Sequence, residues 1–252
     1  MTGTRLQKLL ASLKRIENPI ARDLLLRTRA LVHYAGHGHL ARRRLVDEYL
    51  RSEPAPRLHL GSGPVRLAGW LNSDLISGDV YLDLGRRMPF ADASFGYAFG
   101  EHVIEHLPES QAQASLRELR RVLWPGGVLR LTTPDLRKII AIYEDRNPVV
   151  AREAYARFLD EETGKRHEQP CQILNDYLRL WGHRYVYDEP DLRARLANAG
   201  FENVERVEPG ESRHPLLRGL ERHGGAEWVN RAEAMCLEAA VAAPTVGTLA
   251  HL

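Results

Sequence analysis

Short apolar runs that end in glycine or in an acidic residue recur from residue 57 onward, and helical segments alternate with them. The first run is Leu58-His-Leu-Gly-Ser-Gly63, and Trp70-Leu-Asn-Ser-Asp-Leu75 follows it after a short connection. Strands that alternate with helices and short glycine turns are typical of a parallel sheet whose two faces are covered. The pattern therefore predicts an α/β fold that extends to about residue 208.

The later elements continue this alternation. We expect strands at residues 80–84, 95–99, 128–133 and 201–208, and helices at residues 108–123, 191–199 and 228–242. The segment 144–190 is polar and too long for a simple connection. Insertions over the carboxyl edge of a sheet usually carry specificity, so we expect this segment to bind an acceptor.

The charge of the chain is unevenly distributed. Residues 1–51 contain eleven Lys and Arg against four acids, a net charge of +7, and the other residues carry −5. Apolar positions at helical spacing predict an all-helical cap over residues 1–52. Such an arm could contact nucleic acid, an anionic membrane or an acidic partner. It has few aromatic side chains for base stacking, so we interpret its arginines as the solvated faces of helices.

Composition also indicates where the protein resides. Charged residues interrupt every window of about 18 apolar residues, so we expect no transmembrane helix and no membrane insertion. The first 30 residues lack the apolar core and cleavage site of a secretory signal. Two cysteines, Cys171 and Cys236, cannot form a disulfide framework. We therefore expect a cytoplasmic protein with reduced thiols and a flexible tail at residues 243–252.

Three successive strand ends carry residues suited to binding a nucleotide-like ligand. Gly61-Ser62-Gly63 follows the first strand, and glycines there let the backbone approach a ligand. Asp74 ends the second strand, where a carboxylate can bind the two hydroxyls of a ribose. Asp83 ends the third, where it can accept a hydrogen bond from an adenine amino group, with Leu84 packed on the purine. Each acid alone is more often a helix cap or a solvated side chain, but together the three features favour one ligand site.

Four segments occur in a specific order: Leu58-His-Leu-Gly-Ser-Gly63, Met88-Pro-Phe-Ala-Asp-Ala-Ser-Phe95, His102-Val-Ile-Glu-His106 and Leu119-Arg-Arg-Val-Leu-Trp-Pro-Gly-Gly127. They resemble consecutive motifs of class I S-adenosylmethionine-dependent methyltransferases. The resemblance covers about residues 57–135 and the unit 192–207. It implies a Rossmann-like seven-stranded sheet in a methyltransferase domain over residues 53–242.

The resemblance also implies how S-adenosylmethionine binds at the carboxyl edge of the sheet. It places Gly61 and Gly63 beside the methionine part, Asp74 at the ribose, Asp83 near the adenine, and Glu101 facing the methyl group. One feature departs from the family pattern, because only ten residues separate Gly63 from Asp74. A crossover between parallel strands usually needs a dozen or more residues, so we expect the first helix to be a stub or a loop.

Two further features resemble a subgroup associated with bacterial polysaccharide assembly. They are Gly69-Trp-Leu-Asn-Ser-Asp74 after the glycine turn and Trp181-Gly-His-Arg-Tyr-Val-Tyr-Asp188 in the insertion. The Arg-rich, Lys-poor composition would suit an actinobacterial source, where methylmannose polysaccharides are one conceivable target by analogy alone.

The string His102-Val-Ile-Glu-His106 has two interpretations. It matches an inverted zinc-protease motif, which requires a continuous helix and further ligands. Under the methyltransferase resemblance, Glu101 and His102 face the methyl group, and Glu105 and His106 pack as the first turn of a helix. We favour the second interpretation, because the string follows a strand and meets Pro108.

An alcohol acceptor must lose its proton, which requires a histidine or carboxylate within hydrogen-bond reach. His102 is the first candidate base and His183 the second, although either can instead be bonded to the backbone. Trp181 offers a platform for a sugar face, and we expect Tyr185 and Asp135 in the acceptor site. We assign no metal ligand, and a divalent ion such as magnesium, held by Asp135 with other acids, stays an open alternative.

These observations predict a cytoplasmic O-methyltransferase that uses S-adenosylmethionine and acts on a sugar hydroxyl in polysaccharide or glycan biosynthesis. Its expected partner is a sugar or oligosaccharide, a homodimer is left open, and nucleic acid is not expected. The alternatives are a methyltransferase of a small metabolite or of nucleic acid, tethered by the basic arm, and a cofactor-binding regulatory subunit without catalysis.

Overall fold

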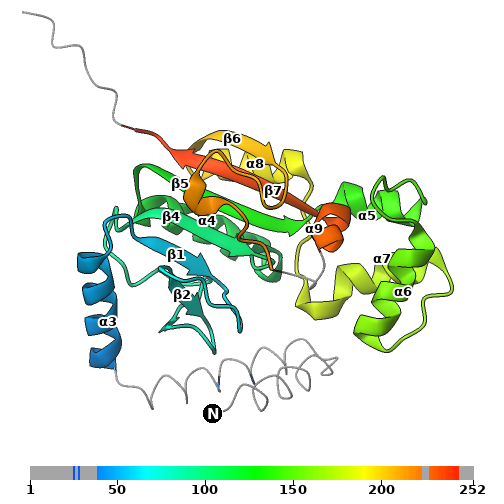
Figure 1. Ribbon diagram of the computed structural model, residues 1–252, viewed down its shortest axis with the longest axis horizontal. Coiled ribbons are helices and arrows are strands. Elements are labelled where there is room, and N and C mark those ends of the chain that lie inside the picture. Colours follow the sequence, from blue (N-terminus) through cyan, green and yellow to red (C-terminus); the bar gives the residue numbers. More distant parts are fainter. Residues whose placement is uncertain (1–24, 26–27, 29–38, 223–226, 244–252) are drawn as a thin grey trace, which may run out of the picture.

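A computed structural model of the chain describes residues 39–222 and 227–243, together with Leu25 and Thr28. Its centre is a seven-stranded sheet of order β3-β2-β1-β4-β5-β7-β6 (Figure 1). β1 to β5 are parallel, and β7 lies antiparallel between β5 and β6. The strands are Arg57–Leu60, Leu71–Asp74, Val80–Tyr81, Phe95–Glu101, Leu123–Pro134, Phe201–Val207 and Ala234–Val241, numbered β1 to β7. The predicted Rossmann-like seven-stranded sheet is confirmed.

The helices surround this sheet unevenly. They are α3 His39–Ser52, α4 Glu109–Val122, α5 Leu136–Tyr143, α6 Arg152–Thr163, α7 Pro170–Arg179, α8 Glu189–Asn198 and α9 Glu227–Glu233. Three short 3₁₀ helices are η1 Ile104–His106, η2 Leu180–Gly182 and η3 Pro215–Leu217. Within the described residues, no helix is both long and apolar enough to cross a membrane.

The two faces of the sheet are covered in different ways. α4 and α8 bury their apolar sides, including Leu116 and Leu192, in the main core with the sheet. On the opposite face, loop residues such as Trp70 and Leu220 pack with Phe99 of β4. The expected cover on both faces is therefore present, but irregular segments supply part of it.

The last element differs from the prediction. We expected one helix over residues 228–242, whereas α9 ends at Glu233 and β7 takes over from Ala234. β7 is buried along nearly its whole length, because it lies between two other strands. A short apolar run fits a strand buried on both faces as well as a buried helix, so periodicity alone does not separate them. The run forms a strand because it pairs with β5 on one side and β6 on the other.

The first connection of the sheet agrees with the prediction. Residues 61–70, all of them described, contain no helix. α3 packs against this region, since the Tyr49 hydroxyl lies 3.0 Å from the carbonyl oxygens of both Arg57 and Gly69. The other two helices expected in the N-terminal cap lie outside the described residues, apart from Leu25 and Thr28.

The insertion forms a small helical unit beside the sheet together with α5, which precedes it in the chain. α5, α6 and α7 lie together beyond the end of β5 (Figure 1) and share a separate apolar core. Ile139, Tyr155, Ile173 and Tyr177 of this core are almost fully buried. The unit stands at the edge where the parallel strands end, which is where open α/β sheets bind ligands.

Candidate active site

A pocket of about 610 Å³ lies where the carboxyl ends of β1 and β4 meet the insertion. Four parts of the chain supply its walls: the end of β1 with the loop after it, the end of β4 with η1, the segment from α6 to just past η2, and the loop before α9 with the end of α9. The lining residues are His59, Gly61, Ser62, Gly63, Pro64, Val65, Glu101, His102, His106, Phe158, Glu162, Tyr177, Trp181, His183, Leu220, Arg222 and Glu233.

The glycine loop has a backbone that few other residues could adopt. Gly61 and Gly63 have φ angles of 57° and 51°, in the left-handed region. A Cβ atom on Gly61 would lie 2.5 Å from Cγ2 of Val103, so the loop approaches η1 closely. Asp74 stabilises the loop, because its Oδ2 accepts a hydrogen bond of 3.1 Å from the Gly63 amide. Its Oδ1 accepts from the Ile76 amide at 2.8 Å.

Glu101 connects three parts of the site at the end of β4. Its carboxylate accepts the Arg222 amide, at 2.8 and 3.0 Å from its two oxygens. It also accepts from the side-chain amide of Asn230 at 3.0 Å. The carboxylate therefore ties the loop before α9, and α9 itself, to the carboxyl end of the sheet.

His102 lies in a left-handed conformation with φ of 48° and is held by acidic neighbours. Its Nδ1 is 3.1 Å from Oε1 of Glu105, and its Nε2 is 3.3 Å from the side-chain oxygen of Asn230. Burial alone would lower the pKa of His102, but Glu105, followed by Glu233 and Glu101, raises it to about 9. Burial would likewise raise the pKa of Glu105, yet its pairing with His102 lowers it to about 2.

His183 has the opposite character. Its Nδ1 lies 2.8 Å from the Tyr177 carbonyl oxygen, which can only accept, so Nδ1 carries the proton and Nε2 a lone pair. Burial is the main cause that lowers the pKa of His183 to about 4. The Trp181 ring lies beside it, with ring centroids 5.8 Å apart. The sequence-predicted pair His183 and Trp181 is thus brought together in the pocket.

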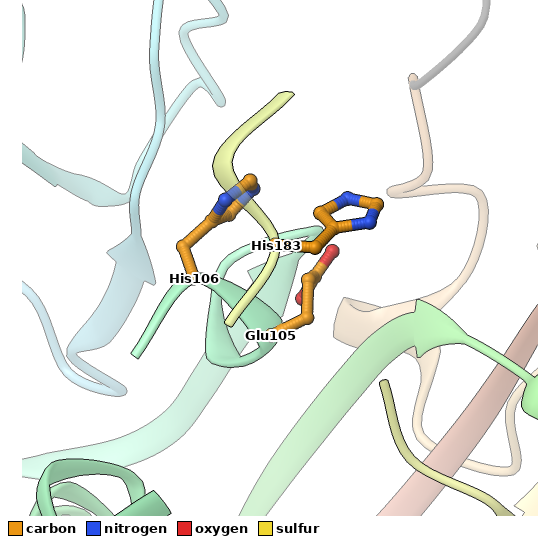
Figure 2. A group of neighbouring side chains, drawn as sticks. All are labelled: Glu105, His106 and His183. Carbon is orange, nitrogen blue, oxygen red and sulfur yellow. The ribbon is translucent and has the colours of Figure 1, made fainter. Parts of the chain in front are cut away.

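Glu105, His106 and His183 form a compact cluster (Figure 2), and their potential ligand atoms all lie within 4.8 Å of one another. Glu105 and His106 come from η1, which is a single 3₁₀ turn that ends before Pro108. His102 precedes this turn in a left-handed conformation. The zinc-protease interpretation, which requires one continuous helix, is therefore wrong. The expected first helical turn is a separate 3₁₀ turn, and α4 begins at Glu109.

Comparisons with known proteins bear on this fold and this pocket. Residues 74–131 match the model of a family described as a methyltransferase domain. The matched segment runs from the end of β2 into β5 and includes the sheet edge that carries Glu101 and His102. The chain is a methyltransferase. Its expected cofactor is S-adenosylmethionine, and no comparison supports a divalent ion.

Solved structures with a similar fold include an S-adenosylmethionine-dependent methyltransferase from Archaeoglobus fulgidus, with 14% identity over 80% of this chain and 93% of that one and a TM-score of 0.42. A methyltransferase from Thermotoga maritima has 14% identity over 83% and 95%, with a TM-score of 0.41. A structure described as a complex with the Haloferax volcanii Trm112 methyltransferase activator has 12% identity over 85% and 94%, with a TM-score of 0.42. At these low identities and TM-scores, the similar structures support no conclusion beyond the fold already described. No curated protein matches the sequence.

Three residues predicted to bind the cofactor are absent from the lining of this pocket. Asp74 lies behind the glycine loop, and Asp83 accepts from the Gly85 amide at 2.9 Å. Leu84 is buried in the main core. Their assignments to ribose and adenine therefore stay predictions. Among the residues predicted to bind the cofactor, Glu101 and Gly61-Ser62-Gly63 do line the pocket.

Two residues predicted for the acceptor site have other contacts. Asp135 caps α5 through the Arg137 amide at 3.0 Å and pairs with Arg206 at 2.9 Å. The guanidinium carbon of Arg195 lies over the Tyr185 ring, 4.7 Å from the ring centroid. Neither residue lines the described pocket, so the geometry gives their predicted roles no support.

Sequence analysis missed Glu233, which is 4% exposed and lines this pocket. The Tyr155 hydroxyl donates to it, and burial raises the pKa of its carboxyl group. An acid within an otherwise apolar stretch was the available signal, but the helix expected over residues 228–242 gave it no special position.

Proposed function

We propose that this methyltransferase transfers a methyl group from S-adenosylmethionine to a hydroxyl of a carbohydrate acceptor. The observation that carries the proposal is the pairing of Trp181 and His183 in the pocket that the glycine loop also lines. An aromatic ring suits the apolar face of a sugar, and a histidine with an available lone pair suits its hydroxyl.

The cofactor end of the pocket is supported by shape and charge. The glycine loop presents backbone without side chains, which lets a ligand approach closely. Glu101 and the buried Glu233 line the same space, and carboxylates favour the positive sulfonium of S-adenosylmethionine. Bound there, this cofactor supplies an activated methyl group: an O–CH₃ bond forms as the S–CH₃ bond breaks, and the breaking pair of electrons stays on sulfur.

The chain's own residues must then align the acceptor and receive its proton. His102 and His183 are both candidate bases, and they differ in protonation state. With a pKa of about 9, His102 carries its proton at neutral pH and suits a positioning or charged role. Nε2 of His183 has a lone pair, because Nδ1 is committed to the Tyr177 carbonyl. We therefore assign contact with the acceptor hydroxyl to His183.

The insertion supplies the acceptor side of the pocket. Phe158 and Glu162 of α6, Tyr177 of α7 and Trp181 of η2 all line it. Sugar acceptors need both apolar surface and hydrogen-bonding groups, and this wall has both. The same wall could accept a small metabolite with a hydroxyl, so the choice of acceptor needs a direct test.

The test is methyl transfer from labelled S-adenosylmethionine to a panel of oligosaccharides, small alcohols and RNA. The proposal expects labelled oligosaccharide, with at least roughly tenfold less product from Trp181→Ala. His214→Ala, a change outside the pocket lining, is the control and should keep wild-type activity. Label that appears only in RNA or in a small metabolite would contradict the carbohydrate assignment, and cofactor binding without any turnover would favour a regulatory subunit.

A further inference from the structure

The cluster of Glu105, His106 and His183 has a donor set that suits a metal ion. A carboxylate and two imidazoles lie with their ligand atoms within 4.8 Å of one another (Figure 2). His106 and His183 also line the pocket, whereas Glu105 is fully buried behind them. The cluster is thus closed on the protein side and open on the pocket side.

The backbone holds the cluster together. The amides of Arg184 and Tyr185 donate to the Glu105 carbonyl oxygen at 2.7 and 3.1 Å. These bonds fix the end of the insertion, and with it His183, against η1. The three side chains therefore come from two segments far apart in the sequence that the fold joins at one point.

Hydrogen bonds orient two of the three side chains from behind. His183 donates its Nδ1 proton to the Tyr177 carbonyl oxygen at 2.8 Å, which leaves Nε2 for a ligand. Oε2 of Glu105 accepts from the Thr133 hydroxyl at 3.0 Å. Histidines and carboxylates that bind metals in proteins are oriented in this way by backbone carbonyls and hydroxyls.

The other oxygen of Glu105 supports the same conclusion. Oε1 is buried and, among the described residues, has no neighbour in hydrogen-bond geometry, although Nδ1 of His102 lies 3.1 Å away. Oε1 is thus paired with His102 by charge but accepts no aligned hydrogen bond, so a carboxylate lone pair remains there for a metal ion.

We propose that Glu105, His106 and His183 form a binding site for one zinc-class divalent ion, with an open position toward the pocket. Three protein ligands and one open position are the pattern of catalytic zinc sites, and structural sites instead have four. Ligands at about 2.1 Å from one ion lie no more than ~4.2 Å apart, so the cluster contracts slightly on binding.

The donor set also selects the ion. Imidazoles suit zinc and its neighbours in the first transition row, whereas magnesium prefers oxygen ligands in an octahedron. Two of the three groups here are imidazoles. Asp135, the residue considered for a magnesium ion, is not part of this cluster. Its carboxylate instead caps α5 and pairs with Arg206.

The role of this ion in catalysis rests on the proposed function, because the ion would act on the acceptor hydroxyl. An acceptor hydroxyl in the open position would be oriented, and its proton would leave more readily to water as its oxygen attacks the methyl group. His183 would then contact the acceptor through the ion rather than as a free base.

Metal binding can be tested without turnover. The full chain, freed of metal by a chelator, is titrated with Co²⁺, and the visible absorption of the bound ion and the stoichiometry after dialysis against Zn²⁺ are measured. We expect one ion per chain. His106→Ala and His183→Ala should each weaken binding by roughly tenfold or more, whereas the control His214→Ala should bind like the wild type.

Circular dichroism of each variant shows whether it folds, and His106→Gln replaces His106→Ala if the latter does not. An ion that binds equally well to the wild type and to both cluster variants, or no ion bound at millimolar metal, would overturn the inference. Those results would leave the proposed methyl transfer untouched. Conversely, a chain that binds the ion but labels no acceptor would refute the proposed function and not the site.

Discussion

At the scale of single residues, the surroundings of two histidines give them opposite proton states. His102 sits among carboxylates, which raise its pKa to about 9. Burial lowers the pKa of His183 to about 4, and the Tyr177 carbonyl fixes its tautomer. A residue type alone therefore could not assign the roles. The sequence identified both histidines as candidates, but the neighbours that separate them lie far away in the chain.

The glycine loop provides a prediction at this scale. Gly61→Ala would add a methyl group 2.5 Å from Val103 at a φ of 57° and push the loop into the pocket. We expect the affinity for S-adenosylmethionine, measured by calorimetry, to fall roughly tenfold or more, a loss of about 1.4 kcal/mol. Gly164→Ala is the matched control, because its φ is 67° and a Cβ there meets no atom within 4 Å.

Both variants should lose stability by about 1–2 kcal/mol through the left-handed conformation. Equal cofactor affinity in the two would show that the Gly61 loop is not part of the cofactor site.

The two cysteines provide a second prediction. Cys171 is exposed, whereas Cys236 is buried in β7, and burial raises the pKa of its thiol to about 12. A thiol with a raised pKa carries almost no thiolate at pH 8, and the thiolate is the reactive form. Alkylation of the folded chain at pH 8 should therefore label Cys171 alone, with both thiols labelled in denaturant. Mass spectrometry reads the outcome, and rapid labelling of Cys236 in the folded chain would contradict its burial.

At the scale of elements, one buried arginine joins the centre of the sheet to the loop before α9. Arg130 of β5 is fully buried and pairs with Glu238 of β7 at 2.6 Å and with Glu221 of the loop at 2.7 Å. The neighbours of Glu221 in the chain, Leu220 and Arg222, line the pocket. The ion pairs therefore connect strand packing to the position of a pocket wall.

Loss of this arginine should be costly. Arg130→Met would leave two buried carboxylates without their cation, and we expect a loss of about 3–5 kcal/mol in the free energy of unfolding. Arg213→Met removes an exposed pair with Glu205 and should cost less than about 1 kcal/mol. Denaturant unfolding of both variants measures the difference. Similar small losses would mean that the buried network contributes little.

At the scale of the whole molecule, local patterns predicted the part of the fold in which they repeat. The parallel strands, the glycine loop and the missing first helix all follow from short stretches such as residues 58–74. β7 could not be predicted in this way, because its apolar run is compatible with either a helix or a strand until the neighbouring strands are known. Glu233 and Arg222 were missed for a related reason, since only the folded chain brings the residues after β6 to the end of β4.

The same limit applies to the candidate site. The sequence identified Glu101, His102, Trp181 and His183, which lie at strand ends or in motifs. It also placed Asp135, at a strand end, and Tyr185, in the insertion motif, in the acceptor site, and the structure gives them partners of their own. Which side chains share a pocket depends on packing, which a single sequence does not show.

The chemical position of the transferred methyl group tests the proposed methylation of a sugar hydroxyl most directly. The chain is incubated with S-adenosylmethionine carrying a ¹³C-labelled methyl and with the oligosaccharide panel, and the product is analysed by nuclear magnetic resonance. We expect a methyl signal bonded to a sugar oxygen, strongly reduced in His183→Ala and unchanged in His214→Ala. A labelled methyl on nitrogen or carbon, or no labelled carbohydrate although the cofactor binds, would contradict this expectation.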